Sequence, residues 1–223
     1  MLNFPRSTEF NKRISKQKFY DKLSIKPELK RVFTNQISAI HWRNKIAATT
    51  LNVAQGERVT ELEVFELRLS QQSLDSSVLH LIDRELPYHI LFIMTYGDEC
   101  QAWIGYKEPS ISKPDEFKVS SYYHTEWMAP ENLGLRLEGL SIDAIYDNLV
   151  RQIAGDRLDS GATTTLKDAV ERDNMRQQLD KKITAVEAKV RKEKQFSRQV
   201  ILNSELKELK KELRGYDETD EHV

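Results

Sequence analysis

The 223-residue chain contains 39% hydrophobic and 31% charged residues, a composition typical of a globular domain that carries a long, solvated helical segment. Its single cysteine, Cys100, excludes a disulfide within the chain and a zinc site built from several thiolates, so we expect a reducing cytoplasm. The opening residues, MLNFPRSTEFNKR, lack the apolar core of a secretory signal. No segment approaches the roughly 18 apolar residues of a membrane span, so we expect a soluble, cytoplasmic protein.

Charge is distributed unevenly along the chain, although the net charge is only −1. Residues 1–50 contain eleven Lys or Arg and three acids, a balance of +8, whereas residues 51–155 contain eight and seventeen, a balance of −9. Residues 156–223 contain fifteen of each sign. A basic end beside an acidic body suggests an anionic partner. The alternatives are that the basic end docks on the acidic body or is simply a solvated face.

Apolar spacing predicts two helices at the start of the chain and two more further along. Residues 10–23 carry apolar side chains at four- to five-residue intervals. Residues 27–47 repeat apolar side chains at i, i+3, i+4 and i+7 after Pro27, which suits a first helical turn. Two later helices, 75–87 and 141–155, have cap and stop signals. These signals are Asp75 and Pro87 for the first, and Ser141 or Asp143 and Gly155 for the second.

Strands are predicted in the middle of the chain. Residues 58–71 alternate between β-branched, aromatic and charged side chains, and we expect the glutamates of this strand at 61 and 63 to be exposed. Residues 87–108 indicate two strands joined by a turn, and residues 116–128 indicate another. The apolar run 90–94 predicts a central strand that is covered on both faces. Together these elements predict an α+β domain, residues 1–155, with a mostly antiparallel sheet of about four strands and packed helices.

The remainder of the chain is predicted to be helical. Residues 156–165 have the composition of a linker, residues 166–214 of a long coiled-coil segment, and residues 215–223 of an acidic tail. Two apolar seams, each spaced 4-3-4, predict contact with a partner helix or a second copy. The seam residues are Leu179, Ile183, Val186, Val190, Leu202, Leu206, Leu209 and Leu213. The seams do not share one heptad register. The chain either continues as one interrupted helix, which the absence of Gly and Pro favours, or reverses as an antiparallel hairpin.

Few residues suggest catalysis. In YYHTEW, residues 122–127, His124 and Glu126 share one face of a predicted strand, where they could act as an acid–base pair. The aromatic neighbours and the lack of a serine elbow or glycine-rich loop favour a structural role for this stretch. A divergent metal-dependent nuclease would use these two residues with Glu63, Glu66 and Lys107, but their spacing matches no nuclease signature. We assign no catalytic residue, metal or cofactor, and favour a protein that is not an enzyme.

The amino-terminal cations form the clearest candidate binding site. Lysine and arginine side chains release condensed counterions when they neutralise a nucleic-acid backbone, and aromatic residues between them can stack on bases or anchor the segment. The predicted nucleic-acid-binding residues are Arg6, Lys12, Arg13, Lys16, Lys18 and Lys22. No helix-turn-helix or other motif for reading bases accompanies them.

Five stretches of the sequence together resemble a bacterial and archaeal family known only as a domain of unknown function. They are FPRSTEFNKRISKQKFY, PYHILF, WIGYKE, YYHTEW and EKQFSRQVILN. The resemblance extends over nearly the whole chain and implies an α+β body with a carboxyl-terminal helical segment. It supplies no catalytic residues. Genes of this family often lie beside helicase and DNA methyltransferase genes in restriction or phage-defence islands, which implies a setting rather than a mechanism.

The residues and the resemblance together predict a non-catalytic accessory or adaptor subunit of a DNA-targeting defence or restriction assembly. A protein partner, such as a helicase or methyltransferase, or a second copy would bind the coiled coil, and the basic amino terminus would contact DNA. Two alternatives are the divergent nuclease and a regulatory interaction protein with no nucleic-acid role.

Overall fold

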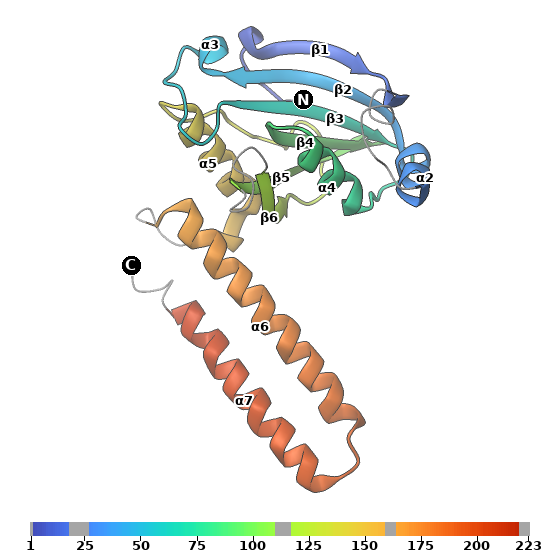
Figure 1. Ribbon diagram of the computed structural model, residues 1–223, viewed down its shortest axis with the longest axis vertical. Helices are drawn as coiled ribbons and strands as arrows, with labels where there is room; N and C mark the ends of the chain where they lie inside the picture. Colours follow the sequence, from blue (N-terminus) through green and yellow to red (C-terminus); the bar gives the residue numbers. More distant parts are fainter. Residues whose placement is uncertain (1, 18–26, 110–116, 159–163, 219–223) are drawn as a thin grey trace. The chain divides into compact units, whose positions relative to one another are not determined.

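The computed structural model describes residues 2–17, 27–109, 117–158 and 164–218. The chain divides into two compact units, Met1–Gly155 and Asp156–Val223, which we name the body and the hairpin (Figure 1). Within the described ranges, no helix has the length and apolarity needed to cross a membrane.

The body is built on a six-stranded sheet in which the spatial order of the strands follows the sequence. The strands are β1 (Glu9–Ile14), β2 (Ile37–Ala47), β3 (Glu61–Leu69), β4 (His89–Tyr96), β5 (Glu99–Pro109) and β6 (Phe117–His124). Strands β3 and β4 are parallel, and every other neighbouring pair is antiparallel. The mixed α+β class is confirmed, but the expected number of about four strands is wrong. The central position of β4 is also confirmed, since its residues from His89 to Met94 are all buried between β3 and β5.

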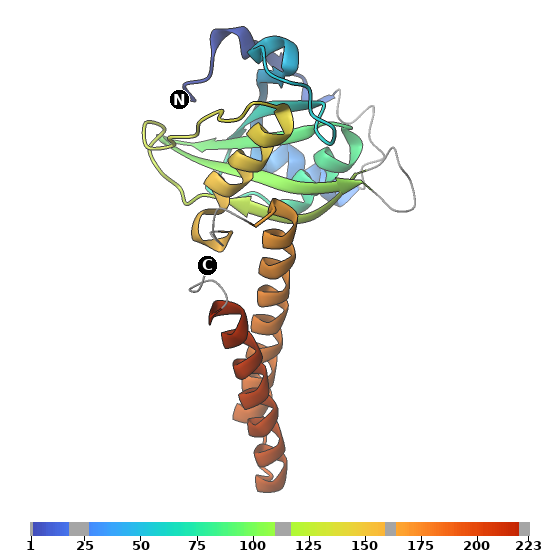
Figure 2. The same cartoon turned by 90° about the vertical axis from the view of Figure 1, so that its left-hand side faces the viewer.

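Helices cover both faces of the sheet (Figure 2). The helical elements of the body are η1 (Arg6–Thr8), α2 (Pro27–Gln36), α3 (Ala48–Leu51), α4 (Ser76–Glu85) and α5 (Ile142–Ala154), and η2 (Gly155–Arg157) follows them. Side chains of α2 and α4 share one apolar cluster with Phe65 and Phe92 of the sheet. On the opposite face, the Tyr146 hydroxyl of α5 donates a hydrogen bond to the Gly105 carbonyl at 2.8 Å and accepts one from the Lys107 N–H at 3.1 Å.

The amino-terminal third corrects the sequence-based prediction. The segment from Glu9 to Ile14 is strand β1 rather than helix, and the predicted helix 27–47 ends at Gln36, where β2 begins. A register irregularity between Ile37 and Ala39 turns Ile37 and Ile40 into the same core cluster. Their three-residue spacing therefore imitates a helix. Strand β2 gains hydrogen-bonding neighbours on both sides, β1 and β3, and this pairing outweighs the local helical pattern.

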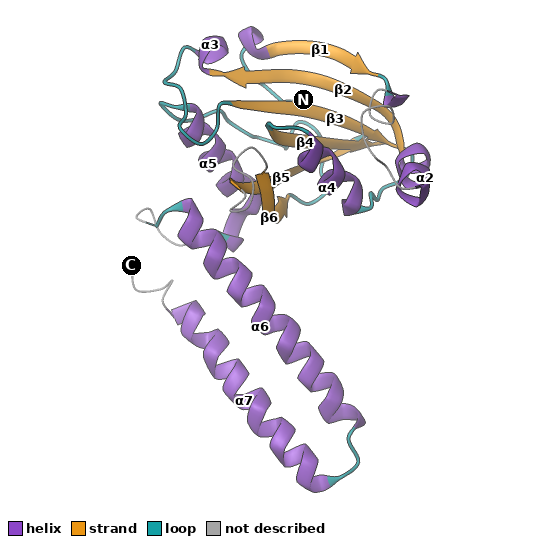
Figure 3. Cartoon of the chain, in the orientation of Figure 1, coloured by secondary structure: helices purple, strands orange, loops and turns teal. Residues whose placement is uncertain are grey.

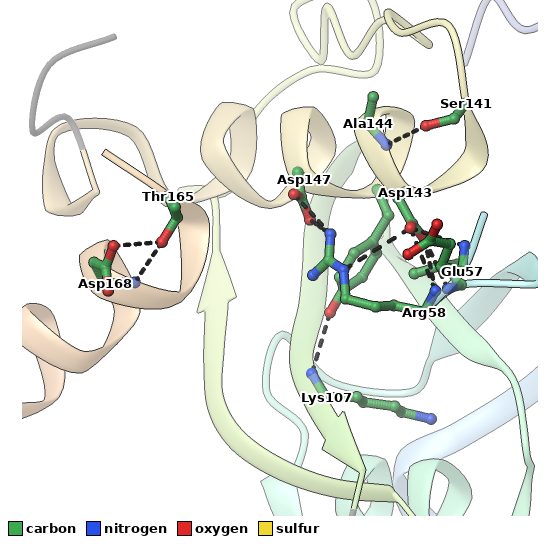
Figure 4. A network of polar contacts seen from close by, with 11 residues as sticks. Glu57, Arg58, Lys107, Ser141, Asp143, Ala144, Asp147, Thr165 and Asp168 are labelled. Carbon is green, nitrogen blue, oxygen red and sulfur yellow. Dashed lines mark hydrogen bonds and ion pairs between the residues drawn. The ribbon is translucent and has the colours of Figure 1, made fainter. Parts of the chain in front are cut away.

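The predicted caps of the two later helices are present. The Asp75 carboxylate accepts the N–H of Ser77 at 2.9 Å, and the Ser141 hydroxyl accepts the N–H of Ala144 at 3.2 Å (Figure 4). Asp143 also fixes the loop before β3, because its carboxylate accepts backbone N–H groups from residues 57–59 at 2.8–3.3 Å. A Cβ at Gly56 would lie 2.4 Å from the Asp143 Oδ1 atom, so this close approach requires glycine.

The hairpin consists of two antiparallel helices, α6 (Leu166–Lys192) and α7 (Phe196–Glu218), joined by three residues (Figure 3). Thr165 is the N-cap of α6, and its hydroxyl accepts the N–H of Asp168 (Figure 4). Glu187 and Lys210 form an ion pair across the hairpin at 2.7 Å, and the Tyr216 hydroxyl lies 3.3 Å from the sulfur of Met175. The chain therefore reverses, and the favoured continuous helix is wrong. Helix α7 also extends into the segment that was predicted to be an acidic tail.

Candidate functional site

The predicted nucleic-acid-binding cations fall into three groups in the structure. Arg6 in η1 and both Lys12 and Arg13 in β1 are exposed. Lys16 has a local partner, because its ammonium group donates to the carbonyl of Ile37 at 2.5 Å and approaches that of Thr34 at 3.5 Å. These carbonyls lie at the end of α2, where a helix has no backbone donors of its own. Lys18 and Lys22 lie outside the described residues.

Strand β1 carries its cations at the edge of the sheet. The Lys12 ammonium lies 4.2 Å from the centroid of the Phe10 ring, and that ring lies 4.1 Å from the Trp42 ring of β2. The aromatic pair holds the edge strand against its neighbour and places a cation over it. Charged side chains on an edge strand also prevent pairing with the edges of other molecules, which is a structural reason for the same residues.

A second group of cations surrounds Glu66 on the adjoining strands. Glu66 Oε2 accepts from Arg43 Nε at 2.6 Å and lies 2.5 Å from Arg43 Nη2, and its Oε1 accepts from Arg68 Nε at 2.8 Å. His41 Nδ1 is 3.8 Å from Oε1, and Arg13 lies opposite His41 in the register of β1 and β2. We name Arg13, Arg43 and Arg68 the arginine cluster. Two guanidinium groups on one carboxylate, with Arg13 on the neighbouring strand opposite His41, leave a surplus of positive charge at this side of the sheet.

The ionisation of Glu66 and His41 reflects this surplus. Burial opposes the ionisation of Glu66, but hydrogen bonds and charges from Arg68 and Arg43 outweigh it and hold the pKa of Glu66 below its ordinary value. Burial lowers the pKa of His41, and although Glu66 opposes that shift, the charges of Arg68, Arg43 and Arg13 add to it. A neutral His41 and an ionised Glu66 are therefore the favoured states, which leaves the cluster with a net positive charge at neutral pH.

A cleft of about 660 Å³ opens beside the arginine cluster. Arg43 and Arg68 line it together with Glu66, and Asn11 of β1 links the cleft to the cationic edge strand. The Asn11 side-chain oxygen lies 3.4 Å from Arg43 Nη1. Asn11 has a φ of +48°, one of two positive values among the described non-glycine residues, and the pairing of β1 with β2 is interrupted there. This irregularity allows successive side chains of β1 to serve both the edge and the cleft.

The residues proposed for a nuclease are dispersed. Glu63 and Glu66 are an odd number of positions apart on β3, so they point to opposite faces of the sheet. The His124 ring stacks on Trp103 at 4.3 Å, and both His124 and Glu126 are exposed at the far edge strand and the segment that follows it. Of the described residues, no three or more His, Cys, Asp or Glu side chains form a group that could hold a metal ion.

Two of these residues are instead buried in the core. Lys107 Nζ lies 2.8 Å from Asp83 Oδ1, and both side chains have no exposed surface. Asp83 also accepts a hydrogen bond from the Tyr122 hydroxyl. Burial raises the pKa of Asp83 and lowers that of Lys107, although each partner opposes the shift of the other. Glu63 is only 1% exposed, which corrects the expectation of an exposed carboxylate. Neither the Lys107–Asp83 pair nor Glu63 is accessible to a substrate, so the role of these buried side chains is structural.

The predicted seam residues lie along one side of each hairpin helix. Leu179, Ile183 and Val186 are buried and the other five are half-buried, whereas most neighbouring positions on α6 and α7 are exposed. Because the helices are antiparallel and packed together, the two seams cover each other within one chain. At the turn, three apolar side chains stay exposed: Phe196 at 78%, Val200 at 52% and Ile201 at 67%. We name these three residues the hairpin tip.

Sequence reasoning missed Arg43, Asn11 and the cleft. Alternation along a strand places Glu66 and Arg68 on one face of β3, but the cleft also needs residues of β1 and β2. Both of those segments were predicted to be helices. Phe10 and Ile14 are four residues apart with cations between them, a spacing that fits a helix as well as an edge strand, so the segment gave no local signal for β1.

Comparison with known proteins gives one match. A family model described as "Domain of unknown function (DUF4391)" matches residues 2–213. No curated protein and no solved structure matches the chain.

Proposed function

The chain belongs to the DUF4391 family of domains of unknown function, and from this premise we propose that it is a non-catalytic accessory subunit of a DNA-targeting defence or restriction assembly. The family description assigns no activity, so the support for an accessory role must come from the surfaces of this chain. The observation that carries the proposal is the edge strand β1, which exposes Lys12 on one face of the sheet and Arg13 on the other face, where Arg43 and Arg68 also lie. The defence setting rests on the resemblance to a family whose genes often accompany helicase and methyltransferase genes.

The cation surface suits a phosphate backbone better than a compact small anion. Arg6 of η1 and both Lys12 and Arg13 of the edge strand β1 are exposed, and two carboxylates of β1 and β3, Glu9 and Glu66, are engaged with Asn11 and with two arginines. Extended arrays of this kind contribute affinity that is independent of base sequence and depends steeply on salt. The subunit would therefore hold DNA for an enzyme that supplies sequence recognition and chemistry.

The partner contact is assigned to the hairpin. Its two seams are used within the chain, so we assign the partner contact to the hairpin tip, where three apolar side chains are exposed. Residues 189–201 contain five Lys or Arg and one Glu, a net charge of +4. A partner surface with an apolar centre and an acidic rim complements this charge. A helicase or methyltransferase subunit that presents such a surface fits the proposed assembly.

The DNA contact is tested by the salt dependence of binding. If three exposed cations neutralise phosphates, the slope of log affinity against log salt is about −2.7, and replacing Lys12 and Arg13 with Glu reduces it to about −0.9. Fluorescence anisotropy with a labelled duplex measures both slopes. The matched control replaces Lys181 and Lys182, two exposed lysines of α6, with Glu, and the wild-type slope should be retained.

Two results would contradict the proposal. Absence of DNA and RNA binding at low salt would favour a regulatory interaction protein without a nucleic-acid role. Cleavage of the DNA in Mg²⁺ or Mn²⁺, abolished by Glu63→Ala or Glu66→Ala, would favour the nuclease. The dispersion of the candidate acids over two faces of the sheet supports the non-catalytic role.

A further inference from the structure

The cleft beside the arginine cluster has the size and lining of a ligand site. Its volume of about 660 Å³ falls within the roughly 300–1,000 Å³ of small-molecule pockets. Its walls come from the amino-terminal segment, from β2, β3 and β4, and from the segment around Pro130. Walls from such distant parts of the chain keep their positions only through the folded body, so the cleft is pre-formed rather than a feature of one loop.

One part of the lining is apolar and the other is cationic. Phe4, Ile93 and Leu133 give the cleft an apolar wall that includes an aromatic ring, and Arg43 and Arg68 give it two guanidinium groups. An aromatic ring can stack on a planar base, and a guanidinium group can hold a phosphate through paired N–H donors. A ligand that matches both walls has a flat, partly apolar ring joined to an anionic group.

Glu66 orients the two guanidinium groups. It binds Nε of Arg68 and both Nε and Nη2 of Arg43, which restricts the rotation of both side chains. The Arg68 side chain remains 53% exposed, and among the described residues its hydrogen bond to Glu66 is made by Nε. The terminal nitrogens of Arg68 are therefore available for a ligand. Because Glu66 already restricts the Arg68 side chain, Arg68 loses less conformational entropy when it binds an anion.

Charge limits the ligand to a single phosphate group. The lining contains Arg43 and Arg68 but also Glu9 and Glu66, so its formal charges cancel. A monophosphate can be held by the outward face of Arg68, whereas the additional charge of a triphosphate would be repelled by Glu9 and Glu66. The exposed cations of β1 could bind the neighbouring phosphates of the DNA strand that carries this nucleotide. This last step rests on the proposed DNA-binding function.

We propose that the cleft binds one unstacked nucleotide of a single DNA strand, with the base against Phe4 and the apolar wall and its phosphate at Arg68. An unpaired nucleotide is required because a base inside a duplex cannot present its faces to a pocket. The body would then favour single-stranded DNA, or duplex with a frayed end, over blunt duplex of the same length.

The test uses the full chain and four probes in isothermal titration calorimetry: 5′-dTMP, 5′-dTTP, thymidine and inorganic phosphate. We expect dTMP to bind more tightly than the other three. Arg68→Gln and Phe4→Ala should each weaken dTMP binding at least tenfold. The matched control is Arg84→Gln, which removes an exposed arginine of α4 that is paired with Glu85 and should leave binding unchanged. Circular dichroism of each variant checks that the body is folded.

The other outcomes overturn the inference in distinguishable ways. Phosphate that binds as tightly as dTMP would show an anion site without base recognition, and dTMP binding that survives both substitutions would place the nucleotide elsewhere. If DNA binds with the predicted salt slope but dTMP does not bind, the inference fails while the proposed function stands. If dTMP binds in the cleft and neither duplex nor single-stranded DNA does, the proposed function fails and the inference of a DNA strand fails with it, which leaves a pocket for a free mononucleotide.

Discussion

Glu63 shows how far a residue can depart from its expected ionisation when the sheet closes around it. It lies on β3, opposite Lys45 of β2 and Ile90 of β4. Its Oε2 atom accepts a hydrogen bond from Trp42 Nε1 at 2.5 Å, whereas within the described residues its buried Oε1 atom has no hydrogen-bond partner. Burial, followed by the hydrogen bond and charge of Glu61, raises the pKa of Glu63 to about 8. The two carboxyl groups hold one proton between them at neutral pH.

This raised pKa predicts a pH-dependent effect of Glu63→Gln. The folded pKa of about 8 lies above the ordinary 4.5, so the folded state retains a proton that the unfolded state loses between these values. The carboxyl group therefore reduces stability as pH rises through this window. Glutamine has no proton to lose, so the variant should match the wild type at pH 4.5 and unfold about 3 °C or more higher at pH 8.5.

Thermal unfolding followed by circular dichroism at the two pH values measures the effect. Glu126→Gln is the matched control, because Glu126 is exposed and should show no difference at either pH. An equal change in Tm at both pH values would show that the substitution acts through packing rather than ionisation.

The turn between α6 and α7 is made by side chains rather than by glycine or proline. Glu193 ends α6, and its Oε1 atom accepts the N–H groups of Lys194 and Gln195 at 2.9 Å each. Gln199 donates from its side chain to the Glu193 carbonyl at 2.8 Å. These bonds satisfy backbone groups that the reversal would otherwise leave unpaired. A chain without Gly or Pro at this point can therefore still reverse.

Two aspartate substitutions on α7 separate the seam from the tip. Leu206→Asp places a charge between the two helices, so the hairpin should lose helical circular dichroism while the body keeps its near-ultraviolet signal. Phe196→Asp places the same charge on a side chain that is 78% exposed, so helix content should be retained. In affinity purification from the native host, a protein that binds the hairpin tip should be recovered with the wild type and lost with Phe196→Asp. Equal helix loss in both variants, or none in either, would contradict the assignment of seam and tip.

At the scale of the molecule, opposite charges are concentrated in different parts of the chain. The first fifty residues carry +8 and the next 105 carry −9, yet both belong to the body, whereas residues 156–223 are neutral. Within the body, η1 and β1 expose Arg6, Lys12 and Arg13, and four acids of the acidic part are held by cationic or backbone donors: Glu61, Glu66, Asp143 and Asp147. All the residues assigned to the proposed DNA surface therefore belong to the body.

This separation predicts the behaviour of a chain that ends after Gly155. The sheet, its three main helices and all the cations of the proposed DNA surface lie before that residue. The shortened chain should fold and bind a duplex with the salt slope of the full chain, and it should lose the partner that depends on Phe196. Anisotropy titrations of the two chains give the comparison. A changed slope in a folded truncated chain would show that the hairpin also contacts DNA.

Much of the middle of the body could be predicted from the sequence because its signals are local. The caps at Asp75 and Ser141 lie within a few residues of the helices they start, and the apolar run of β4 is continuous. The two faces of β3 follow from alternation alone. The helical character of residues 166–214 was also predicted, since the 4-3-4 spacing of its apolar residues needs no knowledge of a partner.

The remaining features depend on residues that are distant in the sequence. Strands β1 and β2 form because each pairs with a neighbour. An irregularity in the pairing of β2 with β3 turns both Ile37 and Ile40 toward the core, and their three-residue spacing in the sequence is also typical of a helix. Glu63 is buried because β2 and β4 flank it, and Glu66 gathers its arginines from two strands. The sequence of residues 166–214 allowed either one continuous helix or an antiparallel hairpin, and the contact between the two seams in the folded chain selects the hairpin. Local spacing sets which face of an element is apolar, but the free energy of burial and of pairing belongs to contacts between elements, and those contacts form only when the chain folds.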